Sequence, residues 1–408
     1  MSDNWIKNIV LFLLSQNISL FGSSLVQYAI FWHITLSTQS GLMMTIYIIF
    51  GFLPTFFLSP FAGVWADRYS RKLLIILSDS AIAISTLVLA ILFLLGYDML
   101  WLLFVVSAIR ALGTAVQMPT VGALVPQLVP VDKLTRVNGS NSSIQSAIML
   151  VSPMLSAALL TLTSIEIIFF IDVVTAAVAV SILLVFLQVP VHAKAREKSD
   201  TGYFRDMQAG FKYINQNSYL KQLFLFCALY FILVAPVAFL TPLQVTRSFG
   251  GDVWRLTAIE VAFSLGMMLG GLIIASWGGF RNRTHSLSLS ILVIGASTIA
   301  LGITPIFWIY LFFMGLAGIV MPIFHTPFTV LLQEKVEADF LGRIFGVLSM
   351  ISSTMMPLGM LLFGPLADLI KIEWLLIGTG LLIFVEGFFL LGSKVLMEAG
   401  KPMGKPEV

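Results

Sequence analysis

The chain has 408 residues, of which 58% are hydrophobic and 11% are charged, with a formal net charge of +3 and a mean hydropathy of +0.99. A soluble domain carries about 25% charged residues, so this chain has too few charges to coat soluble domains of its total length. The apolar runs are ~20 residues or longer, which is typical of membrane-spanning helices and not of the ~10-residue alternating strands of a barrel. We therefore predict an all-α, multi-spanning membrane protein.

Twelve apolar segments follow one another along the chain, separated by charged turns or by turns marked with Gly and Pro. The first segment has one lysine before it and no small-residue cleavage site, so we interpret it as a retained span and not as a signal peptide. In chain order the predicted spans are 8–34, 41–66, 73–96, 100–123, 138–163, 165–188, 218–246, 256–278, 285–304, 306–332, 341–369 and 373–396.

One long polar stretch, 189–217, divides these spans six and six. We predict an N-terminal six-helix bundle over 1–188, a cytoplasmic central loop over 189–217, and a C-terminal six-helix bundle with a short cytoplasmic tail over 218–408. Lys and Arg set the orientation. Nineteen of the 23 lie in loops on the side of the two termini, three lie in the opposite loops, and one lies within a span. Both termini are therefore predicted to be cytoplasmic.

The two halves also share short segments at matching places. The turn "GVWADRYSRKLL" (63–74) lies between spans two and three, and "GGFRNR" (278–283) lies between spans eight and nine. Likewise "LTRVNG" (134–139) precedes the fifth span and "LGRIFG" (341–346) opens the eleventh. These matches favour a duplicated architecture whose substrate site lies between the halves near the bilayer midplane. Chance similarity of apolar sequence is the alternative.

The spacing Gly63-x-x-x-Asp67-Arg68-x-x-Arg71-Lys72 resembles the signature of the major facilitator superfamily. Segments along nearly the whole chain are similar to the macrolide-efflux branch of that superfamily: "GFLPTFFLSPFAGVWADRYSRK" (51–72), "IRALGTAVQMPTVGALVPQLVP" (109–130), "VSPMLSAALL" (151–160), "IDVVTA" (171–176) and "QEKVEADFLGRIFGV" (333–347). The resemblance implies the twelve-helix major facilitator fold and a drug:proton antiporter of a bacterial cell membrane. The chain departs from the superfamily pattern at Ser70, where Gly is usual, and at Ser152-Pro153, where a Gly-Pro pair is usual.

By this resemblance the charged turn belongs to a conformational latch. Asp67 lies at the end of a span, where its carboxylate can accept hydrogen bonds from the N-terminus of the eleventh span. Such a latch holds the two halves closed on the cytoplasmic side, and a few kcal/mol suffice to shift a two-state population. The alternatives are a solvated loop for the basic residues and a simple ion pair for Asp79. The predicted latch residues are Gly63, Asp67, Arg68, Arg71, Lys72, Asp79 and Arg343.

Arg110 is the only basic residue deep within a predicted span. A charge at that depth normally faces the bundle interior or a water-filled cavity, and snorkelling to the headgroups is the alternative. The resemblance implies that Arg110 biases the proton affinity of a nearby carboxylate. A carboxylate whose surroundings alternate between an apolar medium and an arginine can bind and release a proton. Asp172 and Glu260 are the first candidates and Glu386 is the third, each with a structural hydrogen-bonding role as its alternative.

Polar and aromatic side chains within the spans are candidates for the substrate cavity. Large amphiphilic substrates suit an apolar and aromatic wall with few polar anchors. Contact with lipid is the alternative for any single aromatic residue, because the chain has 33 phenylalanines and most of them must face lipid. The cavity candidates are Gln16, Gln27, Tyr28, Trp32, Gln117, Gln145 and Tyr230.

The sequence has no G-x-x-x-x-G-K-[ST], H-E-x-x-H or G-x-S-x-G motif and no cysteine or histidine cluster. We therefore expect no enzyme activity, no cofactor, no metal and no nucleic-acid partner. The predicted function is proton-coupled efflux of amphiphilic drugs, with macrolides as one candidate class, and the partners are the substrate, protons and the lipid bilayer. A separate ATP-binding resistance protein is left open as a partner. The alternatives are a uniporter or symporter of the same fold and a non-transporting membrane receptor or scaffold.

Overall fold

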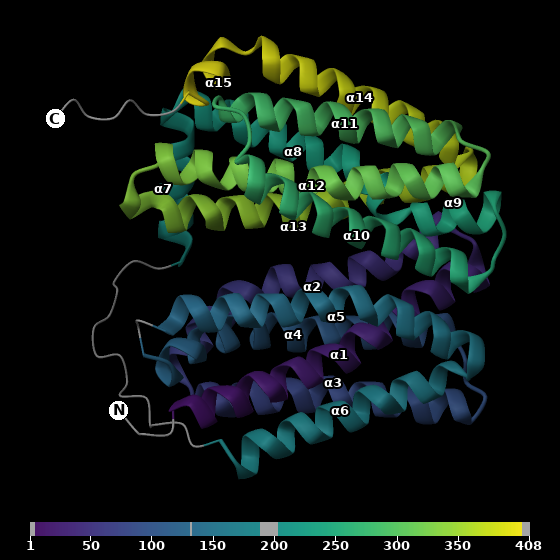
Figure 1. Cartoon of the computed structure of the whole chain (residues 1–408). Coiled ribbons are helices and arrows are strands. Elements are labelled where there is room, and N and C mark those ends of the chain that lie inside the picture. The colour runs from purple at the N-terminus through teal and green to yellow at the C-terminus, as the bar shows by residue number, and fades with distance from the viewer. Residues whose placement is uncertain (1–4, 131–132, 188–202, 402–408) are drawn as a thin grey trace. The chain divides into compact units, whose positions relative to one another are not determined.

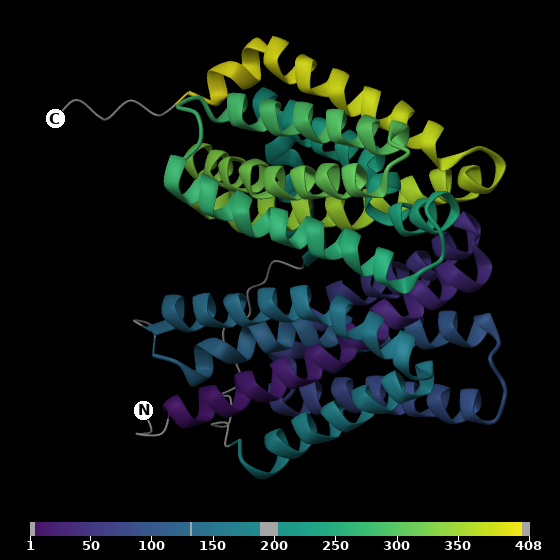
Figure 2. The same cartoon turned by 45° about the vertical axis from the view of Figure 1, so that its right-hand side comes forward.

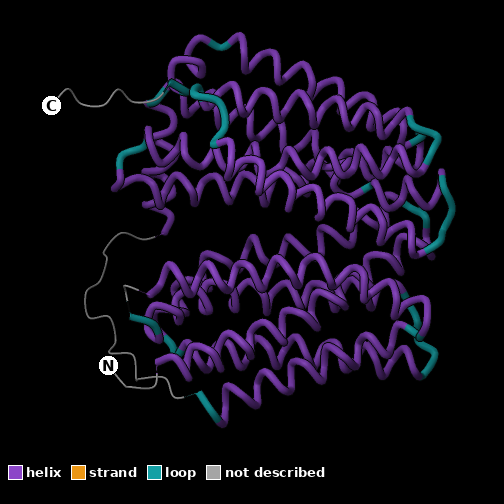
Figure 3. The backbone as a smooth tube through the Cα atoms, viewed as in Figure 1, coloured by secondary structure: helices purple, strands orange, loops and turns teal. Residues whose placement is uncertain are grey.

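The computed structural model describes residues 5–130, 133–187 and 203–401, and every regular element within these ranges is a helix (Figure 3). This confirms the all-α prediction. The chain forms two compact units. Unit 1 comprises Met1–Ser37 and Ile46–Ser199, and unit 2 comprises Thr38–Thr45 and Asp200–Val408. Unit 2 therefore includes a short piece of the N-terminal half, the turn between the first two spans.

Unit 1 is built from six long helices, coloured purple to teal in Figure 1. Each of them contains a segment apolar enough to cross a membrane, as expected for helices that contact lipid and one another. The six are α1 (Trp5–Thr38), α2 (Gly41–Arg68), α3 (Arg71–Leu94), α4 (Leu100–Leu128), α5 (Leu134–Leu162) and α6 (Ile165–Val185).

Unit 2 contains the remaining described helices, coloured teal to yellow in Figure 1. Three of them, α7, α9 and α15, are short. The other helices are long enough to span a bilayer, and α9 continues the span that begins with α8. The described helices of unit 2 are α7 (Tyr203–Gln216), α8 (Ser218–Phe239), α9 (Thr241–Ser248), α10 (Val253–Trp277), α11 (Arg283–Ile303), α12 (Phe307–Lys335), α13 (Ala338–Leu369), α14 (Ile372–Gly392) and α15 (Lys394–Ala399).

The twelve predicted spans are confirmed, because twelve segments of the described chain are long and apolar enough to cross a membrane. Within the polar stretch 189–217, which was predicted to connect the two bundles, residues Tyr203–Gln216 form the helix α7. Ile214 of α7 is buried, and the ring of Tyr213 stacks on Phe340 with a centroid separation of 4.4 Å. An amphipathic helix of this kind has little overall hydropathy, so composition alone made it resemble a loop.

Close helix packing in unit 1 depends on two glycines. α3 lies beside α4 and α6, as the two views in Figures 1 and 2 show. A Cβ at Gly113 of α4 would be 2.6 Å from Cγ1 of Ile82 on α3, and a Cβ at Gly22 of α1 would be 2.0 Å from Oγ1 of Thr175 on α6. Only glycine permits these approaches, so α1 and α4 reach the interior of the unit where α3 and α6 meet.

Unit 2 uses the same device between α10 and α12. Gly266 and Gly270 lie on α10, and a Cβ at either position would be within 2.1 Å of a backbone carbonyl oxygen of α12. α11 and α14 also run side by side in Figures 1 and 2, with Gly295 and Gly380 at their contact. Such small-residue contacts allow backbones to approach closely where the surrounding lipid is as apolar as the side chains.

Candidate functional site

A buried ion pair lies in the interior of unit 1. Nη1 of Arg110, on α4, is 2.5 Å from Oδ2 of Asp172, on α6. The Asp172 side chain is completely buried, and the Arg110 side chain is 11% exposed. The structure therefore brings together Arg110 and Asp172, two of the predicted proton-coupling residues, which are 62 residues apart in sequence.

Two further residues complete the surroundings of this pair. Oγ1 of Thr86, on α3, donates to Oδ2 of Asp172 at 3.0 Å, and Oγ of Ser23, on α1, donates to Oδ1 at 3.2 Å. Arg110 in turn donates to Oγ1 of Thr86 at 2.5 Å and to the backbone carbonyl of Ser23 at 3.1 Å. Four helices thus supply one connected network, in which both carboxylate oxygens and both terminal guanidinium nitrogens have partners.

The network determines what the site can do chemically. A buried ion pair is kept only where its geometry is good and its remaining hydrogen-bonding groups are satisfied, and removing one partner leaves an uncompensated charge. A proton that binds to Asp172 would cancel the charge that holds Arg110, although Thr86 and the Ser23 carbonyl could still accept hydrogen bonds from the guanidinium. A change in the charge of either residue would therefore alter the contact between α4 and α6.

A second acidic cluster lies in the same unit, around Asp79 of α3. Its side chain is 1% exposed, and its Oδ1 accepts from Nε2 of Gln117 at 2.6 Å and from Oγ of Ser19 at 3.0 Å. Gln117 also donates to Oε1 of Gln16 at 3.3 Å. The structure thus places Asp79 in the interior of unit 1 and not at the charged turn, and it brings two of the predicted cavity residues, Gln16 and Gln117, to this carboxylate.

The basic residues of the charged turn contact the ends of neighbouring helices. Nη1 of Arg71 donates to the carbonyl of Ala123 near the end of α4 at 2.7 Å, and Nζ of Lys72 donates to the carbonyl of Leu187, just after α6, at 2.8 Å. At the end of α6, the lysine satisfies a carbonyl group near those that a helix end leaves unpaired. Arg71 and Lys72 are therefore built into unit 1 and are not part of a merely solvated loop.

Three of the predicted latch residues, Gly63, Asp67 and Arg68, have side-chain environments outside the described part of the structure. The guanidinium of Arg343, on α13, lies over the ring of Phe340 at 5.3 Å from its centroid. The latch remains a prediction from the sequence.

The other cavity candidates of unit 1 do not gather at one place. Tyr28 and the fully buried Trp32 are neighbours on α1, with ring centroids 5.5 Å apart. Gln27 and Gln145 are exposed, and the backbone carbonyl of Gln27 accepts from the hydroxyl of Tyr47 at 3.2 Å.

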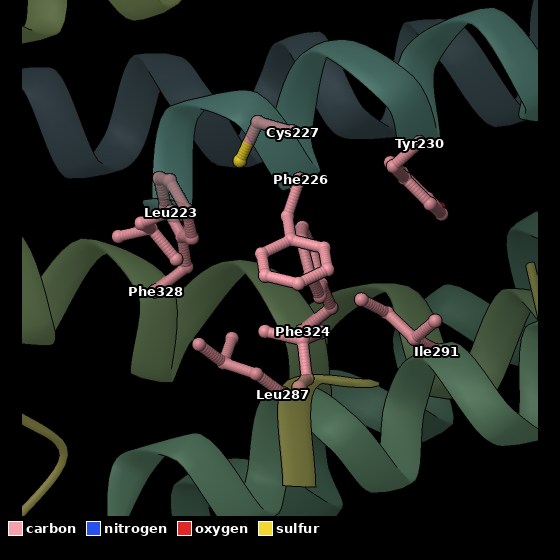
Figure 4. Close-up of a pocket in the computed structure, with 9 residues that line it drawn as sticks. Leu223, Phe226, Cys227, Tyr230, Leu287, Ile291, Phe324 and Phe328 are labelled. Atoms are coloured by element: carbon pink, nitrogen blue, oxygen red, sulfur yellow. The ribbon is translucent and has the colours of Figure 1, made fainter. Parts of the chain in front are cut away.

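Tyr230 lines a pocket inside unit 2 (Figure 4). Its ring stacks on Phe324 with a centroid separation of 5.4 Å, and Figure 4 shows side chains of α8 and α12 pointing toward one another there. The remaining lining is almost wholly apolar and consists of Leu223, Phe226, Cys227, Leu287, Ile291, Phe328 and Leu390.

The two carboxylates predicted in unit 2 have fewer partners than those of unit 1. Glu386, on α14, is 2% exposed, and neither of its carboxylate oxygens has a hydrogen-bond partner among the described residues. It lies one turn before Leu390, a pocket residue, and acts electrostatically on Cys227 and Tyr230. Glu260, on α10, is half-buried. The structure does not join either of them to an arginine within the described part of unit 2.

One polar cluster in unit 2, around Asp368, was not predicted from the sequence. Asp368, near the end of α13, accepts hydrogen bonds from the backbone N–H groups of Gly41 at 2.7 Å and Leu42 at 2.9 Å, at the start of α2. The hydroxyl of Ser40 and the guanidinium of Arg247 also donate to it, at 2.7 and 2.8 Å. The available signal was an acid near the end of one span and a serine just before another helix, where its N-terminus attracts negative charge.

The sequence matches the Major Facilitator Superfamily over residues 9–360, and the chain belongs to that superfamily. Together with the twelve apolar helices, this defines a multi-pass membrane transporter. The chain is 32% identical to Macrolide efflux protein A of Streptococcus pyogenes over 386 residues, which cover 94% of this chain and 95% of the relative. It is also 32% identical to Macrolide efflux protein A of Enterococcus faecalis, over 76% of this chain and 97% of the relative.

Solved structures confirm the fold. A bacterial homologue of the human lysosomal transporter Spinster has a TM-score of 0.75 and is 14% identical, with 99% of this chain and 100% of that chain covered. The nucleoside transporter NupG has a TM-score of 0.73 and is 14% identical, with 96% and 99% covered. At this identity the similarity shows the major facilitator fold and not a shared substrate.

Proposed function

We propose that this transporter exports amphiphilic drugs across the cytoplasmic membrane in exchange for protons, with macrolides as the first candidate class. Alternating access of the two six-helix halves is the expected mechanism. Both termini are expected on the cytoplasmic side, because Lys and Arg are concentrated in the loops of that side.

The observation that carries proton exchange is the buried Arg110–Asp172 ion pair. Charged residues within membrane spans are rare and mark ion pathways and proton relays. Here the carboxylate is completely buried, and its cation comes from another helix, so protonation would change the contact between α4 and α6. A proton that binds to Asp172 thereby supplies free energy to a rearrangement of helices, which is what coupling requires.

The substrate class is supported by the relatives. Two proteins named for macrolide efflux match this chain at 32% identity, and each is covered over at least 95% of its own length. Macrolides are large amphiphiles, and sites for such ligands have apolar and aromatic walls with few polar anchors.

The decisive experiment measures accumulation of radiolabelled erythromycin, with a panel of lipophilic dyes, in cells with and without the protein. We expect the expressing cells to accumulate less drug, and the difference to disappear when an uncoupler collapses the proton gradient. A difference that persists with uncoupler would indicate a uniporter of the same fold. Equal accumulation of every compound in both cell types would overturn the export proposal and favour a non-transporting receptor or scaffold.

The predicted latch gives a separate test of alternating access. An Asp67→Asn variant should still bind erythromycin but lose turnover, because the amide lacks the charge that a helix N-terminus favours. Equilibrium binding to purified protein and export from cells are measured in parallel. Loss of binding with the same substitution would mean that Asp67 contacts the substrate or supports its site, and that the latch assignment is wrong.

A further inference from the structure

The two acidic clusters of unit 1 are built on the same three helices. Thr86 and Asp79 are seven residues apart on α3, and Arg110 and Gln117 are seven residues apart on α4. Seven residues are about two turns, or roughly 10 Å, so both pairs keep to one face of their helix. α1 contributes Ser19 to one cluster and Ser23, one turn later, to the other.

These spacings stack the clusters along the helices. One layer holds the Asp172 carboxylate with Thr86, Ser23 and Arg110, and the next holds the Asp79 carboxylate with Ser19 and Gln117. Since α4 runs opposite to α3 in the predicted topology, the order of the residues agrees on both helices.

The two carboxylates nevertheless differ in how their charge is balanced. Asp172 has the Arg110 guanidinium as counter-ion and partners on both oxygens. Asp79 accepts hydrogen bonds on Oδ1 from Ser19 and Gln117. Its buried Oδ2 makes no hydrogen bond of normal geometry with the described residues, and the only side chain that adds to its stabilisation there is the neutral amide of Gln16. A bare carboxylate oxygen in a medium of low dielectric is unfavourable.

No cation among the described residues compensates Asp79. The groups that face it are Ser19 and Gln16 from α1, Gln117 from α4 and, through space, Asp172 from α6. The basic residues at the start of its own helix, Arg71 and Lys72, donate to helix carbonyls instead. The negative charge of Asp79 therefore has no counter-ion among the described residues, and a proton is small enough to reach it in the closed interior.

We propose that Asp79 is a second proton-binding site of this transporter, with Oδ2 as the atom that takes the proton, and that it works in series with the Arg110–Asp172 pair. A proton enters from water at one layer and leaves from the other, and Ser19 and Gln117 hold the Asp79 carboxylate in place throughout. This inference rests on the proposed proton exchange and names a second group that performs it.

The first experiment reads the proton directly. Infrared difference spectra of the purified full-length protein in lipid nanodiscs, recorded across a pH series, report the carbonyl band of protonated carboxylic acids. We expect Asp79→Asn to remove one component of that band, whereas Asp98→Asn, at an exposed aspartate in the turn after α3, keeps it. An unchanged band in Asp79→Asn would overturn the proposal.

A second variant keeps the inference testable if Asp79→Asn does not fold. Ser19→Ala removes one donor to Oδ1 and leaves the carboxyl in place. We expect it to move the pH midpoint of the same infrared component, with no such movement in the Asp98→Asn control. A midpoint identical to that of the wild-type protein would assign the band to another group and contradict the proposal.

The last experiment separates this inference from the proposed function. Erythromycin is added to the purified protein in weakly buffered solution, and proton release is followed with a pH indicator. We expect fewer protons from Asp79→Asn than from the wild-type protein at equal drug binding, and equal release from both would contradict a coupled role of Asp79. A wild-type protein that binds no erythromycin would instead overturn the substrate proposal, and the infrared series would still decide whether Asp79 holds a proton.

Discussion

Buried carboxylates have different surroundings in the two units. In unit 1, Asp172 receives hydrogen bonds from residues on α1, α3 and α4, and Asp79 receives them from residues on α1 and α4. In unit 2, Glu386 is equally buried, yet neither oxygen has a partner among the described residues. When a carboxylate in such a network binds a proton, its contacts with the arginine and the hydroxyls change, and so can the packing of several helices. Protonation of an isolated acid breaks no hydrogen bond to another helix.

This difference suggests a division of work between the units. Unit 1 contains the groups that a proton-dependent rearrangement needs: an arginine, two acids and the hydroxyls that link them. Unit 2 contains a small apolar pocket around Tyr230 and Phe324, next to an acid that makes no hydrogen bond with the described residues. If the division is correct, substitutions in unit 1 change coupling and substitutions near Glu386 change little.

The largest expected effect comes from removing the cation of unit 1. Arg110→Ala should abolish erythromycin export, because it leaves the Asp172 charge buried without its counter-ion, a loss that typically amounts to about 3–5 kcal/mol. Arg110→Lys should retain only part of the activity, since a lysine cannot reproduce the contacts with Thr86 and Ser23 together. Export is measured in cells at matched membrane abundance, and wild-type export by Arg110→Ala would remove this residue from the mechanism.

A smaller effect is expected from disturbing the packing beneath the network. Gly22→Leu places a side chain where even a Cβ would be 2.0 Å from Thr175 and 3.1 Å from Asp172, so α1 must move away from α6. Overpacking of this kind destabilises a protein by about 1–3 kcal/mol. Gly51→Leu, on α2, is the matched control, because a Cβ there meets no atom within 4 Å.

Thermal unfolding of the purified variants measures this difference. We expect a lower midpoint and weaker export for Gly22→Leu and neither change for Gly51→Leu. Equal midpoints for the two variants would show that α1 can shift without loss, and that the network does not depend on this close approach.

The sequence was sufficient to predict the twelve spans and to single out Arg110 and Asp172 as candidates, and there are physical reasons for both. Spans were predictable because their length and apolar composition are set by the bilayer. Arg110 and Asp172 were predictable because a charge within an apolar run is conspicuous. Their direct contact was not, since it depends on the rotation of α4 and α6, and nearly uniform apolarity leaves no periodic pattern that reveals rotation.

Two acids show the limits of that reasoning most clearly. Asp79 follows the basic turn in sequence and was predicted to be a latch residue. In the structure, its carboxylate accepts hydrogen bonds from Ser19 and Gln117. Asp368 was not singled out, because its partners Ser40 and Arg247 are more than 100 residues away in the chain. In both cases the partner residues, and not the acid itself, define the role.

The smallest effect on export is expected at the isolated acid of unit 2. Glu386→Leu removes a buried group that makes no hydrogen bond with the described residues, so export should stay close to the wild-type level. The unfolding midpoint should rise, because replacing an unsatisfied polar group by an apolar one of similar size recovers about 1–3 kcal/mol. Glu386→Gln keeps a polar group there and should not stabilise. If both variants fold but lose uncoupler-sensitive export, proton exchange takes place in unit 2 as well, and the contrast between the units would not hold.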